Sequence, residues 1–396
     1  MKTNQKSKWY KLAAILIACS GLSAHAGEED GAFLDPAYKH LTPPIVNDQR
    51  PLEARNLWLE GLPQDMAELS SSDTTSLISK QTLVKSQIAR GTCSIFSATA
   101  MAESMLVIKR GFANTVDLSE EWLEYLAMKG KTGDGSHSYR NFNLLKRYGS
   151  PMESSLPYIG QEWKETTNFP LQKERCDRLK EFAGTNFYKS CLLGHRDEKL
   201  IQTSDQELSN PESKFYDLQF LNARTEAAQL RDQEFIMTGG YYSVYSTYQV
   251  KGLLRQGIPL TLGITFYYGA WNHRYSDKYL IGRDYNNWIK GIVGYPEAGS
   301  KDAVESPKHP AGHSILIVGY DDNKVVTTKV KMENGEEKEF TYKGVYYFKN
   351  SWGTAEFGRE FSLENESHPG YGMITYKYAH EHGGFYQLPL AEKITQ

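Results

Sequence analysis

One cysteine, one histidine and one asparagine, far apart in the chain, have neighbours that suit nucleophilic catalysis. Cys93 begins a helical pattern, His313 leads into the apolar run SILIV, and Asn350 lies in KNSWGT. A thiol nucleophile needs a base to take its proton, a group to orient the base, and donors for the oxyanion. The N-terminus of a helix favours a thiolate. An asparagine can hold an imidazole while Trp352 shields their hydrogen bond from water.

The first half of the chain has helical patterns that would carry the cysteine. We expect helices at 93–110, from 119 onward with Ser119 as the N-cap, and at 139–148 with Gly149 at its end. The second half is richer in strand patterns. We expect a helix at 249–256 and strands at 260–266, 314–318, 325–332, 338–348 and 373–378, with a type I′ turn at Asn334-Gly335. Helices followed by strands indicate an α+β protein of two lobes.

The N-terminus has the pattern of an export signal. Four lysines precede the apolar stretch Leu12–Ala18, and Ala24-His25-Ala26 gives an A-x-A cleavage pattern. We therefore expect a periplasmic or secreted protein. An alternative is a lipoprotein anchored through Cys19, because LIAC at 16–19 resembles a lipoprotein cleavage site. No other segment is apolar enough to span a bilayer.

The composition limits the classes of partner and ligand that we expect. The formal net charge is −3 with 23% charged residues, and no long run of one sign points to nucleic acid or to an anionic membrane. We expect no cofactor and no metal: no glycine-rich phosphate loop occurs, and His380-Glu381-His382 lacks a third ligand at a sensible spacing. The oligomeric state has no signal in the sequence.

Export changes how the cysteines are interpreted. If Cys19 leaves with the signal, Cys93, Cys176 and Cys191 remain. In an oxidising compartment two of the three should pair, and Cys176 and Cys191 are close in sequence. We predict that bridge and a reduced Cys93.

These motifs together resemble the papain-like cysteine peptidases. The similarity consists of Gln-x₅-Cys, a histidine before an apolar strand ending in Gly-Tyr, and KNSWGT. Further stretches agree in order: LSEE at 118–121, Gly135-Ser136, LLKRYG at 144–149, LPY at 156–158, Phe357-Gly358 and Gly370-Tyr371. The resemblance implies a papain-like two-lobe α+β fold, with a helical lobe, a β-barrel-like lobe and the active site in the cleft between them.

The resemblance also implies roles for individual residues. Cys93 would be the nucleophile, His313 its base and ion-pair partner, and Asn350 the residue that orients His313. Gln87 would form the oxyanion hole with the backbone N–H of Cys93. The substrate-binding residues would be Gly135, Ser136 and His137, with Trp352 in support, and the substrate would be a peptide or a protein.

Some features depart from the family pattern. Ser94 follows the nucleophile where the family usually has tryptophan, and Arg90 and Gly133 replace the two cysteines of a family disulfide. The interval from Cys93 to His313 is 220 residues (313 − 93), against about 130–150 in the family. The family's long helical propeptide has no counterpart.

We therefore predict an exported cysteine peptidase that acts through a thioester acyl-enzyme. The expected segments are a signal peptide (1–26), a short extension or pro-segment (27–62), a helical lobe with the nucleophile (63–159), an insertion (160–235), and a β-rich lobe with the histidine and asparagine (236–396). Two alternatives remain: a catalytically silent papain-like peptide-binding protein, and another acyl transferase on the same triad.

Overall fold

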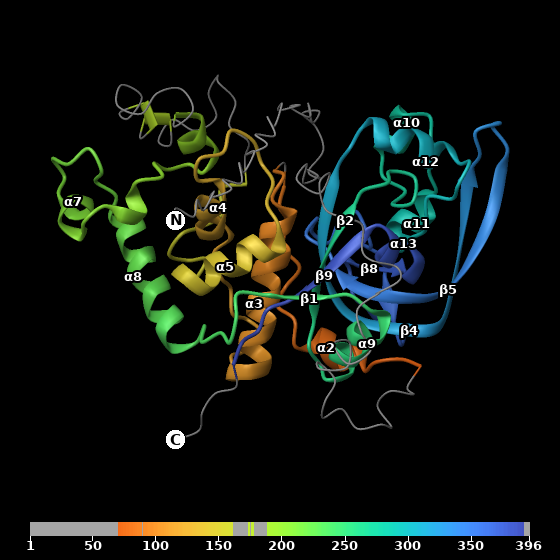
Figure 1. Cartoon of the computed structure of the whole chain (residues 1–396), viewed down its shortest axis with the longest axis horizontal. Helices are drawn as coiled ribbons and strands as arrows, with labels where there is room; N and C mark the ends of the chain where they lie inside the picture. The colour runs from red at the N-terminus through yellow and green to blue at the C-terminus, as the bar shows by residue number, and fades with distance from the viewer. Residues whose placement is uncertain (1–69, 89, 161–172, 175, 178–187, 392–396) are drawn as a thin grey trace, which may run out of the picture.

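The computed structural model describes residues 70–88, 90–160, 173–174, 176–177 and 188–391. The expected signal peptide and extension, residues 1–62, lie outside the described residues. The longer helices gather on one side of the molecule, and most of the strands lie on the other side together with several short helices (Figure 1). The α+β, two-lobe architecture expected from the sequence is confirmed.

The helical lobe is built around α3 (Cys93–Arg110), whose residues are almost all buried from its start to Leu106. The helix ends at Gly111, which has the left-handed φ of 73° that glycine adopts readily. Three other helices have bounds close to those expected: α4 (Glu120–Met128), α5 (Ser138–Tyr148) and α9 (Thr247–Arg255). The Ser119 hydroxyl accepts from the N–H of Trp122, so the predicted N-cap is confirmed.

Residues of the expected insertion pack onto the helical lobe. They include η3 (Leu200–Gln202), α7 (Asp205–Ser209) and α8 (Leu218–Gln233), whose Phe220 lies among Trp122 and Tyr125 of α4. Short helices α2 (Thr74–Ser79), α10 (Tyr275–Lys278), α11 (Tyr285–Ile289), α12 (Lys301–Glu305) and η4 (Ser306–Lys308) complete the connections. The predicted Cys176–Cys191 disulfide is present, with Cα atoms 5.8 Å apart.

The strand lobe is a seven-stranded sheet in the order β1-β9-β2-β4-β5-β8-β3. Its strands are β1 (Tyr242–Val244), β2 (Leu260–Thr265), β3 (Ile292–Val293), β4 (Gly312–Lys331), β5 (Glu337–Lys349), β8 (Tyr371–Thr375) and β9 (Gly383–Gln387). A second sheet pairs β6 (Ser362–Leu363) with β7 (Glu366–Ser367). The large sheet keeps two open edges, at β1 and β3, so among the described strands it does not close into a barrel.

Two local expectations need correction. The hairpin between β4 and β5 is present, but Asn334 does not have the positive φ that a type I′ turn requires at both central residues. Gly335 has φ 87° and donates to the carbonyl of Met332, so the reversal uses one left-handed residue. The last expected strand, 373–378, ends at Thr375 because the Thr375 hydroxyl caps α13 (Tyr376–Glu381).

Candidate active site

Cys93 is the first residue of α3 and is completely buried. Thr92 is the N-cap residue, and its carbonyl accepts from the N–H groups of Ile95 and Phe96. The Thr92 hydroxyl is hydrogen-bonded to the Tyr158 hydroxyl at 2.8 Å instead of capping the helix. The sulfur therefore lies at the positive end of a long helix, which favours a thiolate, in a buried position, which disfavours one.

His313 enters the sheet as the second residue of β4, opposite Ile264 of β2. Its Nε2 lies 2.8 Å from Asn350 Oδ1. That oxygen also accepts from the N–H of Ser351 at 2.9 Å, so it is an acceptor and His313 Nε2 carries the hydrogen. In a neutral imidazole Nδ1 is then the basic nitrogen, and it is buried without a hydrogen-bond partner among the described residues.

Aromatic rings shield this hydrogen bond. The Trp352 ring stacks on the His313 imidazole with centroids 4.5 Å apart, and Trp271 meets it edge-on at 5.1 Å. Burial lowers the pKa of His313 to about 3, although the bond to Asn350 opposes the shift. This environment favours a neutral imidazole and works against the ion pair with Cys93 expected from the sequence. A neutral His313 is suited to accept the thiol proton.

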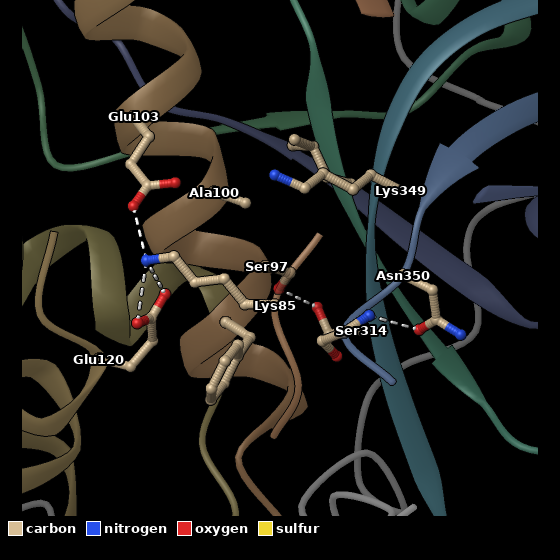
Figure 2. A pocket seen from close by; sticks show the side chains of 11 residues that line it. Lys85, Ser97, Ala100, Glu103, Glu120, Ser314, Lys349 and Asn350 are labelled. Carbon is tan, nitrogen blue, oxygen red and sulfur yellow. Dashed lines mark hydrogen bonds and ion pairs between the residues drawn. The ribbon is translucent and has the colours of Figure 1, made fainter. Parts of the chain in front are cut away.

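A hydrogen bond between the lobes brings the two elements together. Ser97, one turn after Cys93, and Ser314, next to His313, have hydroxyl oxygens 2.7 Å apart (Figure 2). This contact packs the first turns of α3 against the start of β4. The candidate nucleophile and base thus lie on adjoining elements.

Gln87 is buried and bonded at both ends of its amide. Its Oε1 accepts from the Ser351 hydroxyl at 2.7 Å, and its Nε2 donates to the Arg90 carbonyl at 2.7 Å. An amide nitrogen has two N–H groups, so the bond to Arg90 does not exhaust its donor capacity. The side chain is fixed between the segment before Cys93 and the segment after Asn350.

The candidate substrate loop lies between α4 and α5. Gly135 has φ 114°, a conformation that favours glycine, and its carbonyl accepts from Lys131 Nζ. Ser136 donates to Asn141 Oδ1, and Asn141 Nδ2 donates to the carbonyl of Ser94 at 2.8 Å. The loop is therefore tied to the helix that carries Cys93.

His137 continues this loop, and its ring stacks on Tyr139 at 5.1 Å. Tyr139 in turn contacts the rings of Tyr241 and Tyr386, which come from the segment before β1 and from β9. The side chain of the expected substrate residue thus faces an aromatic cluster shared by both lobes.

Two cavities lie near these residues. One, of about 20 Å³, lies between α3 and the sheet beside Asn350, Lys85, Glu103 and Lys349 (Figure 2). That volume holds about one water molecule. The other, of about 420 Å³, is lined by residues that include Val84, Asp117 and Tyr158. Neither lining includes Cys93 or His313.

Sequence reasoning missed a buried cluster of charges behind the nucleophile segment. Glu121, Glu124 and His195 have potential metal-ligating atoms within 4.8 Å of one another. Arginines already provide their positive partners, however: Arg90 contacts Glu124 at 2.6 Å and His195 Nε2 at 3.2 Å, and Arg196 lies 3.5 Å from Glu121. The cluster is an ion-pair network. The only sequence signal for it was Arg90 in the place of a family cysteine.

No helix within the described part of the chain is long and apolar enough to cross a membrane.

Comparison with known proteins finds a family similarity in part of the chain. Residues 70–210 match the family model of papain family cysteine proteases. No curated protein sequence matches the chain. Similar solved structures include xylellain, a cysteine protease from Xylella fastidiosa (15% identity, 83% of this chain and 90% of that one, TM-score 0.47). Another is digestive procathepsin L 3 of the Tenebrio molitor larval midgut (17% identity, 88% and 73%, TM-score 0.41).

The family match spans α3 through α5 and contains Cys93. Over residues 70–210 it bears out the resemblance seen in the sequence: this part of the chain is similar to papain family cysteine proteases.

Proposed function

We propose that the protein hydrolyses peptide bonds through Cys93, His313 and Asn350. The observation that carries the proposal is the 2.8 Å bond from His313 Nε2 to Asn350 Oδ1 beneath Trp352. It fixes the tautomer that leaves Nδ1 as the base, on a strand hydrogen-bonded to the helix of Cys93.

The reaction follows from these groups. His313 Nδ1 takes the Cys93 proton, and the sulfur attacks the peptide carbonyl carbon. The oxyanion accepts hydrogen bonds from the Cys93 N–H and the Gln87 amide. Its collapse breaks the C–N bond as His313 protonates the leaving amine, which leaves a thioester. Water, deprotonated by His313, then attacks the thioester, and release of the acid restores the thiol.

The test is substitution of the nucleophile in the full chain. Cys93→Ala should lower kcat on a peptide library by about 10³-fold or more, because residues of a catalytic unit fail together. Thr99→Val is the matched control: Thr99 is also buried on α3, and its hydroxyl has no hydrogen-bond partner among the described residues. An epoxide inhibitor should alkylate Cys93, and mass spectrometry of the Cys93 peptide should show the added mass. Retained activity in Cys93→Ala would refute the proposal.

The same experiments test the two alternatives. A silent peptide-binding protein would bind peptides without cutting them, and its cysteine would react as an ordinary thiol. An acyl transferase would pass the acyl group from sulfur to an added amine. Product analysis with and without that amine distinguishes transfer from hydrolysis.

We propose His137 as a determinant of specificity. It replaces, by the family resemblance, residues that are often aromatic or apolar, and its ring is already stacked on Tyr139. We expect a weak preference for bulky apolar side chains at the second residue before the cut. Strong selection of Phe or Leu there, read from sequenced library products, would contradict this.

We also retain the five-segment division of the chain and its export as proposals. The disulfide between Cys176 and Cys191 supports an oxidising compartment. Sequencing the N-terminus of the mature protein would distinguish cleavage before Gly27 from a lipidated Cys19.

A further inference from the structure

Arg90 lies three residues before Cys93 and is completely buried. A buried guanidinium must be compensated by charge and hydrogen bonds. Its partners come from three other parts of the chain: the loop before Gly135, helix α4 and the segment 193–195.

The first partner is Asp134, next to the candidate substrate loop. Arg90 Nε donates to Asp134 Oδ2 at 2.8 Å and Nη2 donates to Oδ1 at 2.6 Å, a bidentate pair. Burial raises the pKa of Asp134, but Arg90 outweighs that effect and keeps it below its ordinary value. The carboxylate is therefore ionised and holds the guanidinium in a fixed orientation.

Asp134 also binds the backbone between Arg90 and Cys93. Its Oδ2 accepts from the N–H of Gly91 at 3.1 Å. The approach is close enough that a Cβ on Gly91 would lie 2.8 Å from the Asp134 Cβ. The contact thus requires glycine at position 91.

The segment 193–195 and α4 hold the other side of the guanidinium. Arg90 Nη2 donates to the Leu193 carbonyl at 2.9 Å, and Nη1 lies 3.2 Å from His195 Nε2. His195 adopts a left-handed φ of 58°, and its Nδ1 lies 2.8 Å from Glu121 Oε1. Arginine can only donate, so His195 Nε2 accepts from Arg90 and its Nδ1–H donates to Glu121. The segment that holds Arg90 is itself anchored to α4 by this hydrogen bond.

The segment held in this way includes both proposed oxyanion donors. The Arg90 carbonyl accepts from Gln87 Nε2, and Cys93 follows three residues later. Ile88, in between, has φ 51°, which β-branched residues rarely adopt. Such strain persists only where surrounding contacts maintain it.

We propose that Arg90 is a positioning residue: its bidentate pair with Asp134 holds Gln87 and residues 90–93 against the substrate loop and so sets the oxyanion donors. This inference rests on the proposed function. The pair joins the segment before the nucleophile to the loop before Gly135 without a covalent bond.

Two substitutions test the link without removing a catalytic group. Arg90→Lys keeps the charge but loses the planar fork, and Gly91→Ala changes no charge but pushes Asp134 away. Each should lower kcat by about 10–10²-fold, the effect of a displacement near 1 Å. KM should stay within about twofold, and the pH profile of Cys93 alkylation should match the wild type, because alkylation needs no oxyanion donor.

Matched control variants distinguish a loss of positioning from a general loss of folded, active protein. Gly133→Ala adds a Cβ in the same loop that meets nothing within 4 Å. Arg224→Lys alters a partly buried arginine, which bonds Leu200, Thr203 and Asp205 far along the chain. Both should keep wild-type kcat per site titrated with the epoxide.

The outcomes are distinct. The inference would be overturned if Arg90→Lys and Gly91→Ala kept the wild-type kcat per titrated site. It would also be overturned if these variants lost activity only in proportion to the amount of Cys93 that can be titrated. If the wild type cleaves nothing, or Cys93→Ala still cleaves, the proposed function fails instead.

Discussion

At the scale of single residues, the structure assigns Gln87 two tasks. Its amide bonds the Ser351 hydroxyl and the Arg90 carbonyl, so it joins two segments as well as carrying a candidate oxyanion donor. Removing it leaves buried polar groups without partners, which costs about 1–3 kcal/mol each. A loss of activity in Gln87→Ala must therefore be measured on folded protein.

We predict that Gln87→Ala lowers kcat by about 10²–10³-fold, or some 3–4 kcal/mol of transition-state stabilisation. Gln87→Glu, which keeps an acceptor for Ser351 but has no N–H, should lose as much. Gln81→Ala removes another buried glutamine, bonded to Leu77 and Ser104, and should leave kcat unchanged. Steady-state kinetics on titrated enzyme measure this, and an unchanged kcat in Gln87→Glu would exclude the side chain from the oxyanion hole.

At the scale of elements, α4 connects the nucleophile segment to the region after the disulfide. Glu121 and Glu124 lie one turn apart and face the cluster of Arg90 and His195. Burial raises the pKa of Glu124 to about 8, although Arg90 opposes the shift. Burial also lowers the pKa of His195, but Glu121 outweighs this and raises it.

We predict that Glu124 makes the protein less stable as pH rises from about 5 to 8. Its pKa is higher in the folded state than in the unfolded one, so its contribution is complete below about 4.5 and is lost as pH approaches 8. The free energy of unfolding, measured with denaturant, should depend less steeply on pH in Glu124→Gln than in the wild type. The difference in slope should be up to about 1.4 kcal/mol per pH unit. The exposed Glu212→Gln is the control, and curves for Glu124→Gln parallel to the wild type would contradict the prediction.

At the scale of the whole molecule, polar contacts cross between helices and sheet close to the site. Lys85 lies between the carboxylates of Glu103 and Glu120 (Figure 2). Lys349 of β5 donates to the Thr82 carbonyl. The Ser97–Ser314 bond joins α3 to β4. The relative position of nucleophile and base therefore depends on polar bonds that are largely buried, where a bond is electrostatically stronger than in water.

We predict that Ser97→Ala and Ser314→Ala each cost about 1–3 kcal/mol of unfolding free energy, because each removes the hydrogen bond between the two buried hydroxyls. The double variant should cost less than the sum, since it leaves no unpaired hydroxyl. Denaturant unfolding of all four proteins measures the coupling. Strictly additive losses would mean that the two hydroxyls do not depend on each other.

Much of this protein could be predicted from short stretches of sequence. The helix at 93–110 and the Ser119 cap are encoded by neighbouring residues, and the Cys176–Cys191 pair was predicted from the short interval between the two cysteines together with the expected export signal. The order of Cys93, His313 and Asn350 carried the resemblance to the papain-like cysteine peptidases, because thiol catalysis tolerates few substitutes at these positions.

Other features were decided only by tertiary packing. Nothing near Arg90 in sequence specifies Asp134 or His195 as its partners, because a buried charge is satisfied by whichever groups the fold brings to it. Strand β8 ends at Thr375 because its hydroxyl caps the next helix and the chain no longer continues the strand's hydrogen bonding. The large sheet remains open at both edges. The sequence by itself determined which residues could do the chemistry, whereas the contacts that hold them were decided by packing between distant segments, which local patterns do not encode.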